Sequence, residues 1–477
     1  MRRVLVVAAL VVVVALAGCS GLLDVGGIEE PESNRPDPSE DVLGWEDGYW
    51  WNDSVAVTAS DGLSKAELKV VTARMMARVE RIRGHEFTED VQVTVLSREE
   101  YRSGGSDDPQ GTPTEEQLWE ATFVVGEDAG VAAAFDELYG SAVQGYYTNG
   151  RIVVIGSGSD LGISRATLVH ELEHALQDQQ LTLRVDGRTR DATLAGRGIV
   201  EGDANYVEYL YEQRCANGTY DCIDVPESEG GGAPPTYNRG LFASTFVPYA
   251  EGSTFVAAVH ERGGWDAVDA VFDAQPESTE QVIHPDAYPD ERPDDVIVDD
   301  RSNADWNPVG SPQVVGEATT YAMFWYNGQI PGEHYTSNDD PLSRFTYDHP
   351  ITAGWGGDQL VAYENDGAYG YVWQTTWDSD ADAREFADAY RDLLDSKDAV
   401  ARGDGVFVVH DGAFADAFRV VRRGDTVLVV NAPTVGALDG VHEPRNRALD
   451  HAGDPVKRAL ARTGTDSLFG GPLEARV

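Results

Sequence analysis

Two histidines separated by three residues carry the clearest chemical signal in this sequence. His170 and His174 stand in the run His-Glu-Leu-Glu-His, and Glu171 follows the first histidine directly. On a helix, residues four apart lie on one face with a rise of about 6 Å, so both imidazoles can bind one metal ion. Glu171 falls on the same polar face, and the apolar side chains fall opposite. The spacing predicts a metal-binding helix, the alternative being two unrelated surface histidines.

A third protein ligand must come from another element, because two histidines do not complete a zinc site. Asp178 shares the polar face, but eight residues of helix place it about 12 Å along the axis from His170. The next predicted helix offers three acids, Glu201, Asp203 and Glu208. Two histidines and one glutamate would leave an open coordination position, as in catalytic zinc sites.

The metal-binding run and the acidic run after it resemble a known enzyme class. Residues 170–179 followed by residues 201–204 are similar to the gluzincins, the thermolysin-like clan of zinc metallopeptidases. In that class a glutamate on the following helix is the third ligand. The resemblance implies that Zn²⁺ is the cofactor and that His170, His174 and Glu201 bind it.

The resemblance also implies roles in hydrolysis of a peptide or protein substrate. Glu171 would be the catalytic base that acts on water. A gluzincin also has a His or Tyr that stabilises the oxyanion; no motif for it is matched here, and His284 and Tyr288 are the candidates. One alternative is a non-catalytic surface protein in which zinc joins two helices, although such a site has no need of Glu171. A solute-binding lipoprotein is a second alternative, but it requires two similar α/β lobes.

The elements around the metal helix follow from periodicity and turn signals. Helices are predicted at 164–180 and 191–213, and an Asn-Gly turn joins predicted strands at 144–147 and 151–155. This hairpin would offer an edge strand to which an extended peptide could add. Residues 285–312 are rich in Asp and Pro and suit a linker or a long surface loop.

The predicted fold class is α+β in two parts. Residues 46–300 form a mainly helical, metallopeptidase-like region with a small N-terminal sheet and the metal-binding helix. Residues 301–477 form a smaller α+β region of unknown role.

The N-terminus indicates export. Residues 1–18 have two arginines and a short apolar run, which is too short to span a bilayer comfortably and is typical of a signal peptide. Leu-Ala-Gly-Cys resembles a lipobox, so Cys19 is the predicted lipidation site and residues 19–45 the tether. The protein is expected on the outer face of the cell membrane, with an uncleaved signal anchor as the alternative. The paired arginines suit both the twin-arginine and the general export route.

The other two cysteines, Cys215 and Cys222, stand close together in a Gly/Asn/Asp-containing stretch. In an exported chain this spacing predicts a small loop-closing disulfide, and two free thiols are the alternative.

The charge of the chain is unusual. There are 36 basic and 82 acidic residues, giving a net charge of −46, and only four of the basic residues are lysines. Such a surface repels phosphate backbones, so nucleic acid is not an expected partner. The acids are spread along the chain, which argues against an acidic interaction tail and for adaptation to molar salt. The whole chain also resembles uncharacterised surface lipoproteins of halophilic archaea, through landmarks at residues 246–249, 263–265, 278–285 and 354–358.

Overall fold

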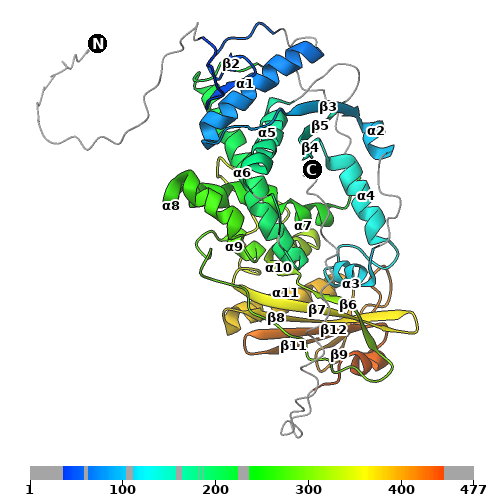
Figure 1. The fold of residues 1–477 in the computed structure, drawn as a ribbon. Coiled ribbons are helices and arrows are strands. Elements are labelled where there is room, and N and C mark those ends of the chain that lie inside the picture. Colours follow the sequence, from blue (N-terminus) through cyan, green and yellow to red (C-terminus); the bar gives the residue numbers. More distant parts are fainter. Residues whose placement is uncertain are drawn as a thin grey trace, which may run out of the picture.

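The protein has an α+β fold, as the sequence predicts, in which a helical region stands on a large antiparallel sheet (Figure 1). A computed structural model describes residues 36–57, 63–103, 111–156, 164–181, 183–185, 187–223 and 236–444. The predicted signal peptide and Cys19 lie outside these residues, as do residues 19–35 of the tether and residues 445–477.

The end of the molecule farthest from the large sheet contains a small sheet and the helices that pack around it (Figure 1). Its elements are β1 (Trp45–Glu46), β2 (Tyr49–Trp50), α1 (Lys65–Arg83), β3 (Gln92–Ser97), α2 (Arg98–Ser103), β4 (Gly145–Thr148), β5 (Arg151–Gly156), α5 (Arg165–Gln180) and α6 (Arg190–Ala216). The sheet has the order β3-β5-β4, with β3 parallel and β4 antiparallel to β5. One core joins α1, α5, α6 and this sheet.

Local sequence signals account for these elements. Ser64 and Glu67 form a capping box at the start of α1, and Gly84 ends the helix in the left-handed conformation. Asn149 and Gly150 both have positive φ, 48° and 76°. Two such residues form the type I′ turn that matches strand twist, so the predicted hairpin is confirmed.

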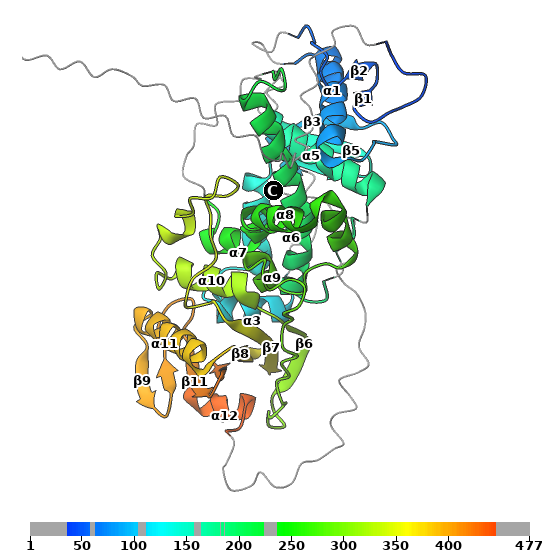
Figure 2. The same cartoon turned by 90° about the vertical axis from the view of Figure 1, so that its left-hand side faces the viewer.

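A second group of helices connects this end of the molecule to the large sheet (Figure 2). It consists of α4 (Val131–Ala142), α7 (Arg239–Ala250), α8 (Gly252–Asp273), α9 (Thr279–Ile283) and α10 (Gly316–Tyr326). α8 is kinked at Gly263 and Gly264, where the backbone leaves helical φ and ψ. α6 packs along α8 and α7, so one long helix contacts both the small sheet's core and the second helical core.

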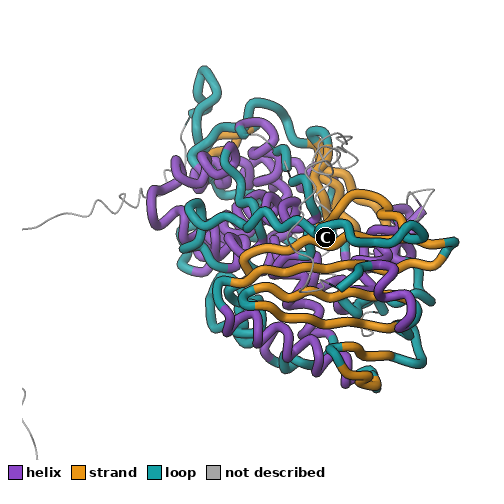
Figure 3. Tube along the Cα trace, turned by 90° about the horizontal axis from the view of Figure 1, so that it is seen from below, coloured by secondary structure: helices purple, strands orange, loops and turns teal. Residues whose placement is uncertain are grey.

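The large sheet has seven antiparallel strands in the order β6-β7-β8-β12-β11-β10-β9, seen face-on in Figure 3. The strands are β6 (Asn307–Gln313), β7 (Trp355–Asn365), β8 (Ala368–Trp377), β9 (Val400–Gly403), β10 (Val406–Val408), β11 (Ala417–Arg423) and β12 (Thr426–Ala432). α3 (Pro113–Ala121), α10 and α11 (Asp380–Ser396) pack on the face toward the helical region. α12 (Leu438–Val441) packs on the other face.

Two features of this half differ from the sequence-based expectation. The segment 285–312, predicted to be a linker or loop, contains the start of β6. β6 is an edge strand, where the missing N–H of Pro308 and Pro312 is tolerated. In addition, α3 comes from the predicted N-terminal region yet packs on β6, β7 and β8. The two predicted regions therefore share a core.

Candidate metal centre

The two helices that bring the candidate ligands together are fixed at their starts and along their lengths. The Ser164 hydroxyl caps α5 and the Thr189 hydroxyl caps α6. Gly202 of α6 lies directly against the backbone of Gly252, where a Cβ would overlap the carbonyl. The junction of α7 and α8 therefore packs closely on the turn of α6 that carries Glu201.

His170, His174 and Glu201 converge with their ligand atoms facing one another. The two Nε2 atoms are 3.1 Å apart, and Glu201 Oε2 lies 3.3 Å from His170 Nε2 and 3.1 Å from His174 Nε2. Ligands about 2.0–2.1 Å from a tetrahedral zinc ion lie about 3.3 Å from one another. The spacing of the three atoms fits zinc, and Glu201 and His174 are buried.

The competing acids on α6 have other partners. Asp203 accepts hydrogen bonds from Arg83 and Gln177, because two residues along a helix turn its side chain away from that of Glu201. Glu208 lies on the outer side of His170, with Oε2 3.7 Å from Nδ1. Of the three acids, Glu201 alone joins the two imidazoles.

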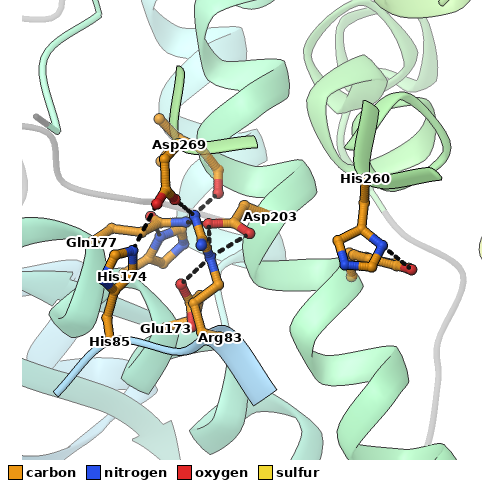
Figure 4. Close-up of polar contacts among 10 residues, drawn as sticks. Arg83, His85, Glu173, His174, Gln177, Asp203, His260 and Asp269 are labelled. Carbon is orange, nitrogen blue, oxygen red and sulfur yellow. Dashed lines mark hydrogen bonds and ion pairs between the residues drawn. The ribbon is translucent and has the colours of Figure 1, made fainter. Parts of the chain in front are cut away.

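Gln177 holds the His174 ring from behind, as Figure 4 shows. Its Nε2 donates to the Val200 carbonyl and to Asp203 Oδ2, each at 3.0 Å. Its Oε1 must then accept from His174 Nδ1, 2.9 Å away. The proton of His174 therefore sits on Nδ1, and the Nε2 lone pair faces the cluster, which is the arrangement that a metal-binding imidazole needs.

A buried arginine pairs with the acids beneath this layer (Figure 4). Arg83 Nε lies 3.1 Å from Asp203 and 3.6 Å from Glu173, and its Nη2 lies 2.6 Å from Asp269. The side chains of Arg83, Asp203 and Glu173 are fully buried. Trp265 covers the guanidinium, whose Cζ is 4.5 Å from a Trp265 ring centroid.

Glu171 is buried beside the cluster but is not one of its three members. Its exposed fraction is 4%, and its Oε2 has no hydrogen-bond partner among the described residues. Burial raises the pKa of this carboxyl to about 7, against the opposing effect of the two histidines. A Cβ built on Gly145, the first residue of β4, would lie 3.2 Å from Glu171 Oε1. The carboxyl therefore lies between the metal cluster and the edge strand.

Tyr249 is a site residue that the sequence reasoning missed. It lies near the end of α7, with its ring stacked at 6.2 Å from that of His170. Burial and its hydrogen bond to Glu201 raise the pKa of the hydroxyl well above the usual range, so it stays protonated. The landmark at residues 246–249 contains it, but no spacing rule connects it to the metal helix.

The two oxyanion candidates taken from the sequence have other partners. His284 Nε2 lies 3.1 Å from Glu317 Oε1, and the Tyr288 hydroxyl donates to the Ala274 carbonyl at 2.6 Å. In the described residues neither contacts the cluster, whereas the Tyr249 ring stacks on His170 and its hydroxyl bonds to Glu201.

A row of half-buried aromatic rings leads away from the cluster along α7. Phe246 stacks on Tyr249 with centroids 5.6 Å apart, Phe242 on Phe246 at 4.8 Å, and Tyr237 follows at 5.4 Å. With His170, these rings form a continuous row of ring contacts that starts at the His170, His174 and Glu201 cluster.

Cys215 and Cys222 form a disulfide, with their Cα atoms 5.6 Å apart. The bridge closes the turn that follows α6, as predicted from the spacing. None of the described helices combines the length and the apolarity that a membrane span requires.

Comparison with known proteins identifies one segment. A family model described as a domain of unknown function (DUF8575) matches residues 307–442, which cover the large sheet with α10, α11 and α12. No curated protein and no solved structure matches the chain. His170, His174 and Glu201 lie outside the matched segment.

Proposed function

We propose that this protein is a zinc-dependent peptidase that is exported and anchored to the cell surface by a lipid on Cys19. The observation that carries the catalytic part is the convergence of His170, His174 and Glu201 at 3.1–3.3 Å, with Glu171 buried beside them outside the ligand set. The N-terminal sequence supports export, and the disulfide suits an oxidising compartment.

Zinc bound by these three residues would polarise a substrate carbonyl and lower the pKa of water. Glu171 is suited to accept a proton from water and pass it to the leaving nitrogen, because burial raises its pKa to about 7. The Tyr249 hydroxyl, kept protonated beside Glu201, is suited to donate a hydrogen bond to the developing oxyanion.

The small sheet supports a binding mode for the substrate. β4 lies at the sheet edge, and its outer side pairs with no other strand of the described residues. An extended peptide could add to this edge by main-chain hydrogen bonds, next to Glu171 at Gly145. The rings of Phe246 and Phe242 favour a large apolar side chain near the scissile bond.

The test compares wild type with Glu171→Gln in 2 M KCl. The variant should keep one zinc by native mass spectrometry but lose at least about 100-fold in kcat/KM on a peptide library. Asp178→Asn is the matched control on the same helix. Its side chain accepts from the Tyr147 hydroxyl and does not touch the cluster, so zinc content and activity should persist.

Two results would overturn the proposal. Loss of zinc in Glu171→Gln would make this residue a ligand. A wild-type protein that holds zinc but cleaves no peptide would favour the alternative of a non-catalytic zinc-binding surface protein.

A further inference from the structure

Three carboxylates from two parts of the chain meet between α3 and the large sheet. Glu120 lies at the end of α3, Glu127 lies in the loop that follows, and Asp416 directly precedes β11. One oxygen of each lies within 4.8 Å of the others. Two oxygens bound to one calcium ion at about 2.3–2.6 Å lie at most about 5 Å apart, so the cluster has the size of a cation site.

Three buried oxygens in and around this cluster lack a hydrogen-bond donor among the described residues. Glu120 and Asp416 are each only 4% exposed, and Glu120 Oε1 is buried without a hydrogen-bond partner. Gln117 donates to Glu120 at 2.6 Å and Asn431 donates to Asp416 at 2.9 Å, yet the amide oxygen of each is buried without a partner. A half-turn of either amide would exchange its nitrogen and oxygen and offer a further oxygen to a cation.

The charges of the cluster are of one sign. Asp416 and Glu127 act on Glu120, and Glu120 and Glu127 act on Asp416; the amides of Gln117 and Asn431 bond to the pair, and the hydroxyls of Tyr371 and Tyr390 lie near Glu120. Burial and the neighbouring acids raise the pKa of Glu120, and burial raises that of Asp416. Buried carboxylates in contact require either a shared proton or a cation between them.

The backbone brings the exposed member of the cluster to the sheet. The Glu127 N–H donates to the Ala413 carbonyl at 3.0 Å. A Cβ on the preceding Gly126 would overlap the Ala413 side chain and carbonyl. The loop after α3 is thus held against the segment that leads to Asp416.

We propose that Glu120, Glu127 and Asp416 bind a hard divalent cation of the calcium type, with Asn431 and Gln117 as further oxygen donors. All these ligands are oxygens, which Ca²⁺ prefers, whereas the histidine-containing cluster suits zinc. The exposed Glu127 leaves a side open for water ligands and for entry of the ion. The ion would join α3 to the DUF8575 segment, and this role does not depend on the peptidase proposal.

The experiment uses the full chain, depleted of metals, reloaded with one equivalent of zinc and kept in 2 M KCl. Addition of CaCl₂ should raise the melting temperature of wild type by roughly 5 °C at saturation. Glu120→Gln/Asp416→Asn should lose this shift. The variant removes buried charge without changing side-chain shape, so it should stay folded without calcium. Asp411→Asn is the matched control, because Asp411 is an exposed acid that precedes Asp416 in the sequence. This variant should keep the calcium-induced shift.

The control separates specific binding from general screening. Equal shifts in all three proteins would overturn the site, because calcium would then act on the acidic surface as a whole. The cation site would also be overturned if neither CaCl₂ nor MgCl₂ changed the melting temperature of wild type. A proton shared between Glu120 and Asp416 would then explain how the two carboxyls are buried together. A heat of calcium binding, measured by titration calorimetry in wild type and in Asp411→Asn but absent in the double variant, would support the proposed site.

Discussion

Replacing Gln177 with leucine should weaken zinc binding although Gln177 is not a ligand. In the native arrangement, the amide fixes the His174 proton on Nδ1 by accepting it at 2.9 Å. Leucine cannot accept, so the ring can move its proton to Nε2. A proton on His174 Nε2 can form a hydrogen bond to Glu201 Oε2, which lies 3.1 Å from Nε2. Zinc must then displace this proton in order to bind. The variant therefore stabilises the tautomer that cannot bind metal.

The magnitude follows from the lost hydrogen bond. A buried donor left without its acceptor costs about 1–3 kcal/mol. Changes to residues that orient metal ligands lower metal affinity about 10–100-fold, and each tenfold change corresponds to about 1.4 kcal/mol. The two ranges agree, so the zinc dissociation constant of Gln177→Leu should rise about 10–100-fold.

The assay is competition for zinc with a chromogenic chelator at fixed pH in 2 M KCl. Gln179→Leu is the matched control, because Gln179 lies on the same helix and binds the backbone of Thr88 and Glu89 instead. The zinc affinity of Gln179→Leu should match that of wild type even if the segment around Thr88 and Glu89 is destabilised. A Gln177→Leu dissociation constant within twofold of wild type, in a folded protein, would refute the tautomer argument.

Stability should respond to the buried charges and to salt. Arg83→Met should lower the free energy of unfolding by about 3–5 kcal/mol, because Asp203 keeps its buried charge without its cation; a loss below about 1 kcal/mol by chemical denaturation would contradict this. Burial raises the pKa of Glu251 to about 8 and of Glu280 to about 9. At a pH between the unfolded pKa of about 4.5 and these folded pKa values, both carboxyls are protonated in the folded protein and ionised in the unfolded chain. The free energy of unfolding therefore falls as pH rises through this range, by up to about 1.4 kcal/mol per pH unit for each group. Melting from pH 5 to 9 with zinc saturating should show the decline, and Glu251→Gln/Glu280→Gln should flatten it; an equal slope in both proteins would exclude these acids as its source. The net charge of −46 predicts a melting temperature that rises steeply from 0.1 to 2 M KCl with zinc saturating, and a flat series would remove the case for salt adaptation.

Elements determined by neighbouring residues could be predicted from the sequence. The helix α5 follows from its apolar periodicity, with His170 and His174 four residues apart on its polar face, and from the Ser164 cap. The hairpin follows from Asn149-Gly150, since a type I′ turn requires two residues that accept positive φ. In each case the interactions that select the structure lie within a few residues of one another.

Elements buried on all sides gave weaker signals. α10 is apolar around nearly its whole circumference and buried along almost all its length, so it has no amphipathic period to read. β7 begins with a bulge at Gly356 and Gly357, which hides the alternation of a strand. α3 was also missed, although its start carries a local signal: Thr112 and Glu115 form a capping box, and Pro113 is the first helical residue.

The choice of partners across elements was made only by the tertiary structure. The sequence left Glu201, Asp203 and Glu208 open as ligands on geometric grounds, and Glu201 was favoured by the resemblance and by the open coordination position that two histidines and one glutamate leave. The packing of α6 on α5 directs Glu201 to the imidazoles and leaves Asp203 to Arg83. The same holds for Tyr249, brought to the site by the junction of α7 and α8 against α6. Spacing along one helix is set by its 3.6-residue period, whereas the contact of two helices depends on how their whole surfaces pack.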